Sequence, residues 1–130
     1  MKNSEDLKED GQNINKSEDK ILSECHLYIW NNFPELRYCS WHVANERKTT
    51  KLQGAILKAK GLVPGVPDYV LNFKGKTYYF EMKSSIGVFS DNQKKCHAAM
   101  KLQGFEVIII RNFDEFEKYL TNLLTKFNIN

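Results

Sequence analysis

Two strand-forming runs on either side of a tight turn restrict the fold of this chain more than any other feature. The runs are residues 68–73 and 77–83, and the turn is Lys74-Gly75-Lys76. This arrangement is typical of a β-hairpin. Counted outward from the glycine of the turn, Asp68 lies seven positions back and Glu81 lies six positions on. The hairpin therefore brings these two acids to the same end of a sheet.

The second strand of the hairpin has two chemically different faces. Residues two apart on an extended strand point to the same side, so Glu81 and Lys83 share one face. Tyr78, Phe80 and Met82 point to the other face and are apolar, as expected for a core. The pattern predicts that the acids and the lysine converge where the sheet opens.

Two carboxylates and a lysine at one sheet edge suit the hydrolysis of phosphodiesters. Asp68 and Glu81 would bind a hard divalent ion, which takes a phosphate oxygen as a further ligand and acidifies a bound water. Lys83 would supply a compact positive charge near the attacking water. Spacing alone equally allows a surface ion pair between Glu81 and Lys83.

The segments around the hairpin alternate between helix and strand patterns. A polar tail is expected to be disordered over residues 1–16, and 17–130 are expected to form one domain. Ser17 is the expected N-cap of the first helix, whose apolar arc includes Ile21, Cys25 and Ile29. The predicted elements are a helix over 17–33, a strand over 38–43, a helix over 50–61, the hairpin, a helix over 90–103, a strand over 105–110 and a helix including 116–127. This α-β-α-β-β-α-β-α order predicts the α/β class, with a small mixed central sheet flanked by helices.

Positive charge is concentrated between residues 47 and 60. The whole chain of 130 residues carries a net charge of +3, but residues 1–20 hold four lysines and six acids, so the remainder carries +5. The run from 47 to 60 contains no acid and five basic residues: Arg47, Lys48, Lys51, Lys58 and Lys60. Such a block indicates either a nucleic-acid contact or a solvated helix face. The apolar side of the same helix, which predicts its core face, comprises Leu52, Ala55, Ile56 and Ala59.

Other features exclude several classes of protein. No stretch approaches the roughly 20 apolar residues of a membrane helix, and no apolar signal core follows Met1. Three cysteines are too few for a disulfide scaffold, and neither Cys25-His26 nor Cys96-His97 has a partner pair at zinc-ligand spacing. We therefore expect an intracellular, cytoplasmic protein, and its Lys- and Asn-rich composition is typical of a bacterial or phage genome of high AT content.

The motifs, taken in order, resemble a known nuclease family. Pro67-Asp68 followed by Glu81-Met82-Lys83 is similar to the PD-(D/E)XK signature. Further matching segments lie at 61–68, 90–93 and 104–107, and together they resemble the virus-type replication-repair nuclease (VRR-NUC) domain over residues 18–120. The segment 41–46 is similar to that family's His-x-Pro-Asn motif, with alanine in place of proline. The resemblance implies a restriction-endonuclease-like core.

The resemblance also implies roles for the hairpin residues. Asp68 and Glu81 would be the central metal ligands, and the backbone carbonyl of Met82 would be a further ligand. Lys83 would be the catalytic lysine. The implied cofactor is Mg²⁺ or Mn²⁺.

Two further site residues follow from the resemblance. Glu24 would be the acid of the first helix that completes the site; it could equally be an ordinary glutamate at a helix edge. Gln93 would be the glutamine of the family motif. It also forms the pattern Ser90-x-x-Gln93, which is a capping box, and both roles are compatible.

The implied partner is branched or structured DNA, read by shape and not by sequence. His42 and Asn45 would contact DNA beside the basic residues of 47–60, although His42 could simply pack on its strand. Small standalone members of the family are similar to Holliday-junction resolvases and act as homodimers. The expected function is a metal-dependent, structure-selective DNA endonuclease. The alternatives are a partner-dependent nuclease subunit in defence or DNA processing, and a non-catalytic nucleic-acid-binding module on the same fold.

Overall fold

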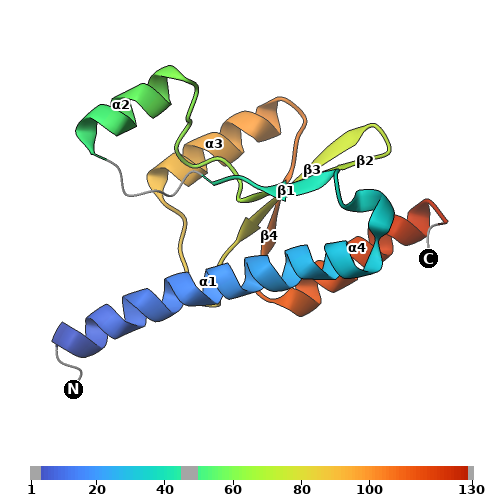
Figure 1. Ribbon diagram of the computed structural model, residues 1–130, viewed down its shortest axis with the longest axis horizontal. Helices are drawn as coiled ribbons and strands as arrows, with labels where there is room; N and C mark the ends of the chain where they lie inside the picture. The colour runs from blue at the N-terminus through green and yellow to red at the C-terminus, as the bar shows by residue number, and fades with distance from the viewer. Residues whose placement is uncertain (1–3, 45–49, 129–130) are drawn as a thin grey trace.

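The computed structural model describes residues 4–44 and 50–128, with side chains described from Ser17 onward. Helices and strands follow the predicted order, with one short 3-10 helix, η1, added after the first helix (Figure 1). The elements are α1 (Ser4–Asn32), η1 (Pro34–Leu36), β1 (Ser40–His42), α2 (Lys51–Ala59), β2 (Tyr69–Phe73), β3 (Lys76–Met82), α3 (Asp91–Leu102), β4 (Val107–Ile110) and α4 (Phe113–Lys126).

The four strands form one mixed sheet in the order β1-β2-β3-β4. The β1–β2 and β2–β3 pairs are antiparallel, and β4 runs parallel to β3 after the crossover through α3. The hairpin turn has positive φ at both central residues, 50° at Lys74 and 76° at Gly75. Turns of this kind match the twist of paired strands. The predicted hairpin is confirmed, and its register places Tyr69 opposite Phe80.

The hydrophobic core lies on the sheet face that α1 and α4 cover (Figure 1). Phe80 of β3 packs edge-to-face on Phe116 of α4, with ring centroids 5.2 Å apart. From α1, Ile21, Cys25 and Ile29 are buried at helical spacing, as the apolar arc predicts. Because this face is fully packed, the polar side chains of β3 are left on the opposite face.

The opposite face of the sheet is covered more loosely, by α3 (Figure 1). None of the side chains of α3 is fully buried. Gln93, Cys96, His97 and Met100 are half-buried and recur at helical spacing, so they form the side of α3 that faces the sheet. A helix that covers a sheet with polar and half-buried groups leaves room for chemistry beneath it.

The first helix begins earlier than the sequence pattern predicts. The pattern places a disordered tail over 1–16 and a cap at Ser17, whereas α1 begins at Ser4 and Ser17 lies inside it. The added segment contains two Glu, two Lys, one Leu and one Gln, which are good helix formers. Extending an existing helix also avoids the cost of a new nucleus. Figure 1 shows this part of α1 reaching past the sheet.

The predicted core face of the second helix is wrong. Leu52 is 72% exposed and Ile56 is 45% exposed, and no side chain of α2 is buried. The helix itself forms as predicted, with a capping box between Thr50 and Gln53. Its apolar side remains open because α2 lies away from the sheet and from α1 and α4 (Figure 1). Helical periodicity identifies an apolar side but not what covers it.

Candidate active site

Asp68 and Glu81 lie side by side at the open end of the hairpin. The backbone N–H of Asp68 donates to Glu81 Oε2 (3.2 Å), and the backbone N–H of Met82 donates to Asp68 Oδ2 (2.9 Å). Both carboxylates are buried, with Glu81 only 1% exposed. Each strand therefore holds the acid of the other by a backbone amide, which fixes both side chains in one place.

Lys83 comes two residues after Glu81, directly after the end of β3, and the alternation of the strand puts it on the same face as Glu81. Its backbone N–H donates to the carbonyl oxygen of Ile110 (2.9 Å), which extends the pairing with β4 by one residue. Its side chain is only 7% exposed, and Nζ lies 5.4 Å from the ring centroid of Phe89. Because Glu81 and Lys83 are both buried, the alternative of a surface ion pair between them is excluded.

Gln93 connects the start of α3 to Asp68 and Glu81, which we call the acid pair. Its Nε2 donates a short hydrogen bond to Glu81 Oε1. Its Oε1 accepts from the backbone N–H of Ser90 (2.9 Å), while its own backbone N–H donates to Ser90 Oγ (3.2 Å). The capping-box interpretation is therefore confirmed, and the same side chain also contacts the carboxylate of Glu81. The role of Gln93 in catalysis stays a prediction.

The loop before Asp68 packs tightly against the start of α3. Gly65 has φ of +90°, and a Cβ added there would lie 2.4 Å from the carbonyl group of Asn92. Only glycine allows both that backbone conformation and that approach. A small cavity of about 180 Å³ remains between loop and helix, lined in part by Asp68 and Gln93. The N-terminus of α3 at this cavity favours negatively charged groups such as phosphate.

The donor set fits a hard divalent cation. Within the described ranges, no group of three or more His, Cys, Asp and Glu side chains is placed to hold a metal ion. The hairpin brings Asp68 and Glu81 together, so these acids would be the side-chain ligands, joined by the Met82 carbonyl and by water. Mg²⁺ is commonly bound through one or two carboxylates and retains several waters, so the pair suits this ion.

Glu24 has a different partner from the one predicted for it. Its side chain is 42% exposed and its Oε1 lies 3.8 Å from Lys20 Nζ, one helical turn away, so its role at the site stays a prediction. Another carboxylate of α1, Glu18, contacts the segment after Lys83, where its Oε1 accepts from the backbone N–H of Ser84 (3.3 Å). Glu18 lies seven residues before Cys25, on the buried side of α1, and that spacing was the available signal.

Arg111 is a second residue that sequence patterns do not single out. Its guanidinium donates to the carbonyl oxygens of Ser84 (2.6 Å) and Gly87 (3.1 Å). Glu18 and Arg111 therefore hold the segment after Lys83 from two sides. A buried lysine needs such support because its long side chain is otherwise flexible.

The residues predicted to bind DNA differ in their contacts and exposure. His42 Nδ1 donates to the backbone carbonyl of Asp68 (2.8 Å), so His42 helps to position the acid's backbone. Lys51, Lys58 and Lys60 are exposed on α2 and at its C-cap. Asn45, Arg47 and Lys48 lie outside the described residues.

Burial shifts the pKa of several groups in the core and near the site. In the core, it raises the pKa of the Cys25 thiol to about 12, with a smaller contribution from Glu24. It also raises the pKa of Cys96, with help from Glu81, and lowers the pKa of His97, with help from Lys83.

The fold defines a mixed α/β domain with a four-stranded sheet flanked by helices. A solved structure described as a "VRR_NUC domain protein" matches with a TM-score of 0.67, covering 82% of this chain and 86% of that chain at 14% identity. The expected α/β fold with a small mixed central sheet is thereby confirmed, and this chain has the fold of that VRR_NUC domain protein. No protein-family model and no curated protein matches the sequence. In the described part of the chain, no helix is both long and apolar enough to cross a membrane.

Proposed function

We propose that this chain is a Mg²⁺- or Mn²⁺-dependent DNA endonuclease that selects branched substrates by structure. The observation that carries the proposal is that Asp68 and Glu81, both buried, lie together at one open edge of the sheet, with the buried Lys83 two residues further along the chain. Buried charges are costly unless they are paired or ligate a metal. Two buried carboxylates held together beside a helix N-terminus are therefore more consistent with a catalytic site than with a structural one.

The residues would divide the work of hydrolysis. Bound by Asp68, Glu81 and the Met82 carbonyl, the ion supplies a Lewis acid for the phosphoryl group and a more acidic water. Lys83 would stabilise the negative charge that develops as the water oxygen attacks phosphorus. A proton passes to the ester oxygen that leaves as the P–O bond breaks. Gln93 would act as a positioning residue, because it holds Glu81 in its ligating orientation.

Charge supports DNA as the substrate. Residues 21–130 carry +5. Lys51, Lys58 and Lys60 are exposed on or just after α2, which is connected to the loop that precedes Asp68. Lysine contacts to phosphate give affinity without sequence information. This fits recognition by DNA structure.

A homodimer is part of the same proposal. Two copies would provide two sites for two strands and double the positive surface, as a branched substrate requires. Sedimentation of the protein with and without a four-way junction tests this point. A complex that contains one copy per junction at saturation would contradict it.

The decisive experiment is cleavage of a panel of labelled DNAs with Mn²⁺. The panel contains a four-way junction, a flap, a nicked duplex, a linear duplex and a single strand. We expect cleavage of the branched members, abolished in Asp68→Ala and retained in Asp114→Ala, a matched change at an exposed acid of α4.

Other outcomes of this panel identify the competing functions. No cleavage of any substrate, together with unchanged DNA binding in Asp68→Ala, would favour a non-catalytic binding module. Cleavage that appears only after addition of a cell extract would favour a partner-dependent nuclease subunit.

A further inference from the structure

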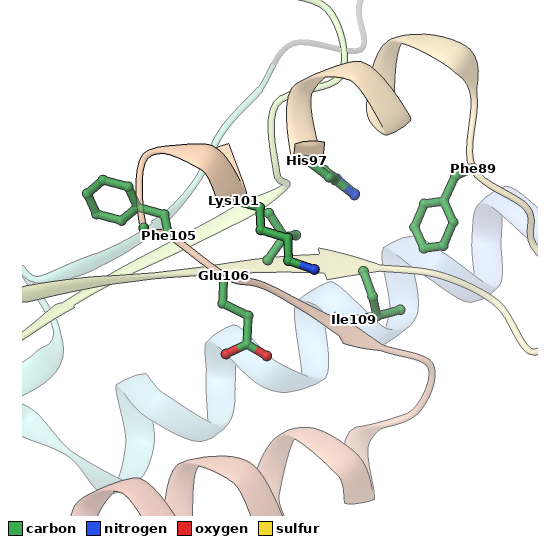
Figure 2. A pocket seen from close by; sticks show the side chains of 8 residues that line it. Phe89, His97, Lys101, Phe105, Glu106 and Ile109 are labelled. Carbon is green, nitrogen blue, oxygen red and sulfur yellow. The ribbon is translucent and has the colours of Figure 1, made fainter. Parts of the chain in front are cut away.

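A second cavity lies on the same sheet face as the acid pair. It has a volume of about 580 Å³ and is formed between α3 and β4 (Figure 2). Phe105 and Phe89 stand at its two ends and Ile109 lies along its floor (Figure 2). The volume is within the range of small-ligand pockets, and the lining combines apolar surfaces with a few polar groups, as such pockets do.

The cavity adjoins the candidate active site directly. Ile109 on the floor is the strand partner of Glu81, so the two lie on adjacent strands about 4.8 Å apart. Phe89, at one end, is the ring that lies 5.4 Å from Lys83 Nζ. A group held in this cavity would therefore sit beside the phosphodiester bound by the acid pair.

The lining of the cavity suits a nucleobase better than a phosphate. It is mostly aromatic and aliphatic, with Phe89, Phe105 and Ile109 among its residues, and burying a phosphate against such groups is costly. His97 packs against Phe89, and its Nε2 is buried without a hydrogen-bond partner in the described part of the chain. Burial and Lys83 lower the pKa of His97. The neutral ring offers one donor and one acceptor, as a base edge requires.

We propose that this cavity receives one unpaired nucleobase of the DNA substrate, next to the phosphodiester that is cut. Phe105 provides an aromatic surface for the base, and Lys101 lies at the same cavity, where it can meet the backbone of that nucleotide (Figure 2). This inference rests on the proposed nuclease function. It explains structural selectivity, because a base in intact duplex must first be unpaired and unstacked at a cost of a few kcal/mol.

A second copy of this chain is the main competing occupant. β4 is an edge strand, and edge strands can pair with another sheet. The cores of protein interfaces are, however, depleted of charged residues. The charged side chain of Lys101 projects into this cavity (Figure 2), so a nucleotide suits it better than a protein surface does.

The test compares two phenylalanine variants. Phe105→Ala removes the aromatic wall, and Phe127→Ala is the matched control, because these rings are 39% and 43% exposed and Phe127 packs on Phe73 at the far end of β2. Binding is measured with Ca²⁺ in place of Mn²⁺, using a flap and a linear duplex of equal length. We expect Phe105→Ala to weaken flap binding about tenfold and to leave duplex binding unchanged, since stacking contributes about 1–3 kcal/mol per base. Phe127→Ala should change neither.

Several outcomes would overturn the inference. These are equal losses on flap and duplex, no loss on either, or loss of self-association in Phe105→Ala by sedimentation, which would assign the cavity to a second copy. Phe105→Leu, which keeps the apolar volume, should show the same selective loss and guards against unfolding of the alanine variant. Binding is measured without cleavage, so this test is independent of catalysis. If the protein binds the flap selectively but cleaves none of the DNAs with Mn²⁺, the proposed nucleobase pocket is supported and the proposed nuclease function is contradicted.

Discussion

Helices α2 and α3 start with the same local structure but have different surroundings. Thr50 with Gln53, and Ser90 with Gln93, form complete capping boxes. Gln93 also donates to Glu81, and α3 rests on the sheet. The apolar side of α2 remains exposed. The comparison shows that a capping signal determines where a helix begins, whereas its role depends on what lies against it.

The largest expected effect is a loss of cleavage when Glu81, the acid that Gln93 of α3 contacts, is changed. Glu81→Gln keeps the shape of the side chain but removes the charge that would hold the cation. We expect cleavage to fall about 1,000-fold, because metal-ion stabilisation contributes several kcal/mol to the transition state. Single-turnover rates with Mn²⁺ measure this. Glu117→Gln, at an exposed position of α4, should cleave normally; an equal loss there would contradict the assignment.

The two capping glutamines give the sharpest comparison. Gln93→Ala and Gln53→Ala each break one capping box, so each should lower the free energy of unfolding by about 1 kcal/mol. Only Gln93→Ala should reduce cleavage, by about 10- to 100-fold, which is typical for residues that orient a metal ligand. The accompanying signature is a higher Mn²⁺ concentration for half-maximal rate. Similar activity in both variants would mean that the contact with Glu81 has no role in catalysis.

Alanine substitutions at two glycines with positive φ distinguish the cost of backbone strain from the cost of a steric clash. Gly61, with φ of +104°, follows α2 and an added Cβ there meets open space, while Gly65 contacts the start of α3. We expect Gly61→Ala to cost about 1–2 kcal/mol from backbone strain alone. Gly65→Ala should cost more and also reduce cleavage, since Asn92 must move. Chemical denaturation of both variants checks this order, and equal stability losses would contradict it.

The smallest effect concerns the exposed side of α2. Leu52→Ala should change the free energy of unfolding by less than about 0.5 kcal/mol, because the side chain is 72% exposed. Met100→Ala, on the half-buried side of α3, should cost about 1–2 kcal/mol, part of the value for a fully buried methionine. Thermal unfolding of the two variants provides the measurement. A large loss in Leu52→Ala would mean that α2 is covered in solution, for instance by a partner.

Local chemistry made much of the fold predictable. The turn at Lys74-Gly75 sets the hairpin register, and the register places Asp68 against Glu81. Alternation along β3 separates Phe80 from Glu81 on opposite faces. These features depend on residues close in sequence or on strand periodicity, so the order of residues is sufficient to predict them.

The amino-acid sequence by itself determined the order of elements, the hairpin, the capping box of α3 and the end of the sheet at which the acids meet. Only the tertiary structure decided that Glu18 contacts the segment after Lys83, and that α2 stays uncovered. A difference of one residue turns a helical side chain by about 100°. The contacts that choose among these orientations join segments far apart in the chain, as Glu18 joins Ser84.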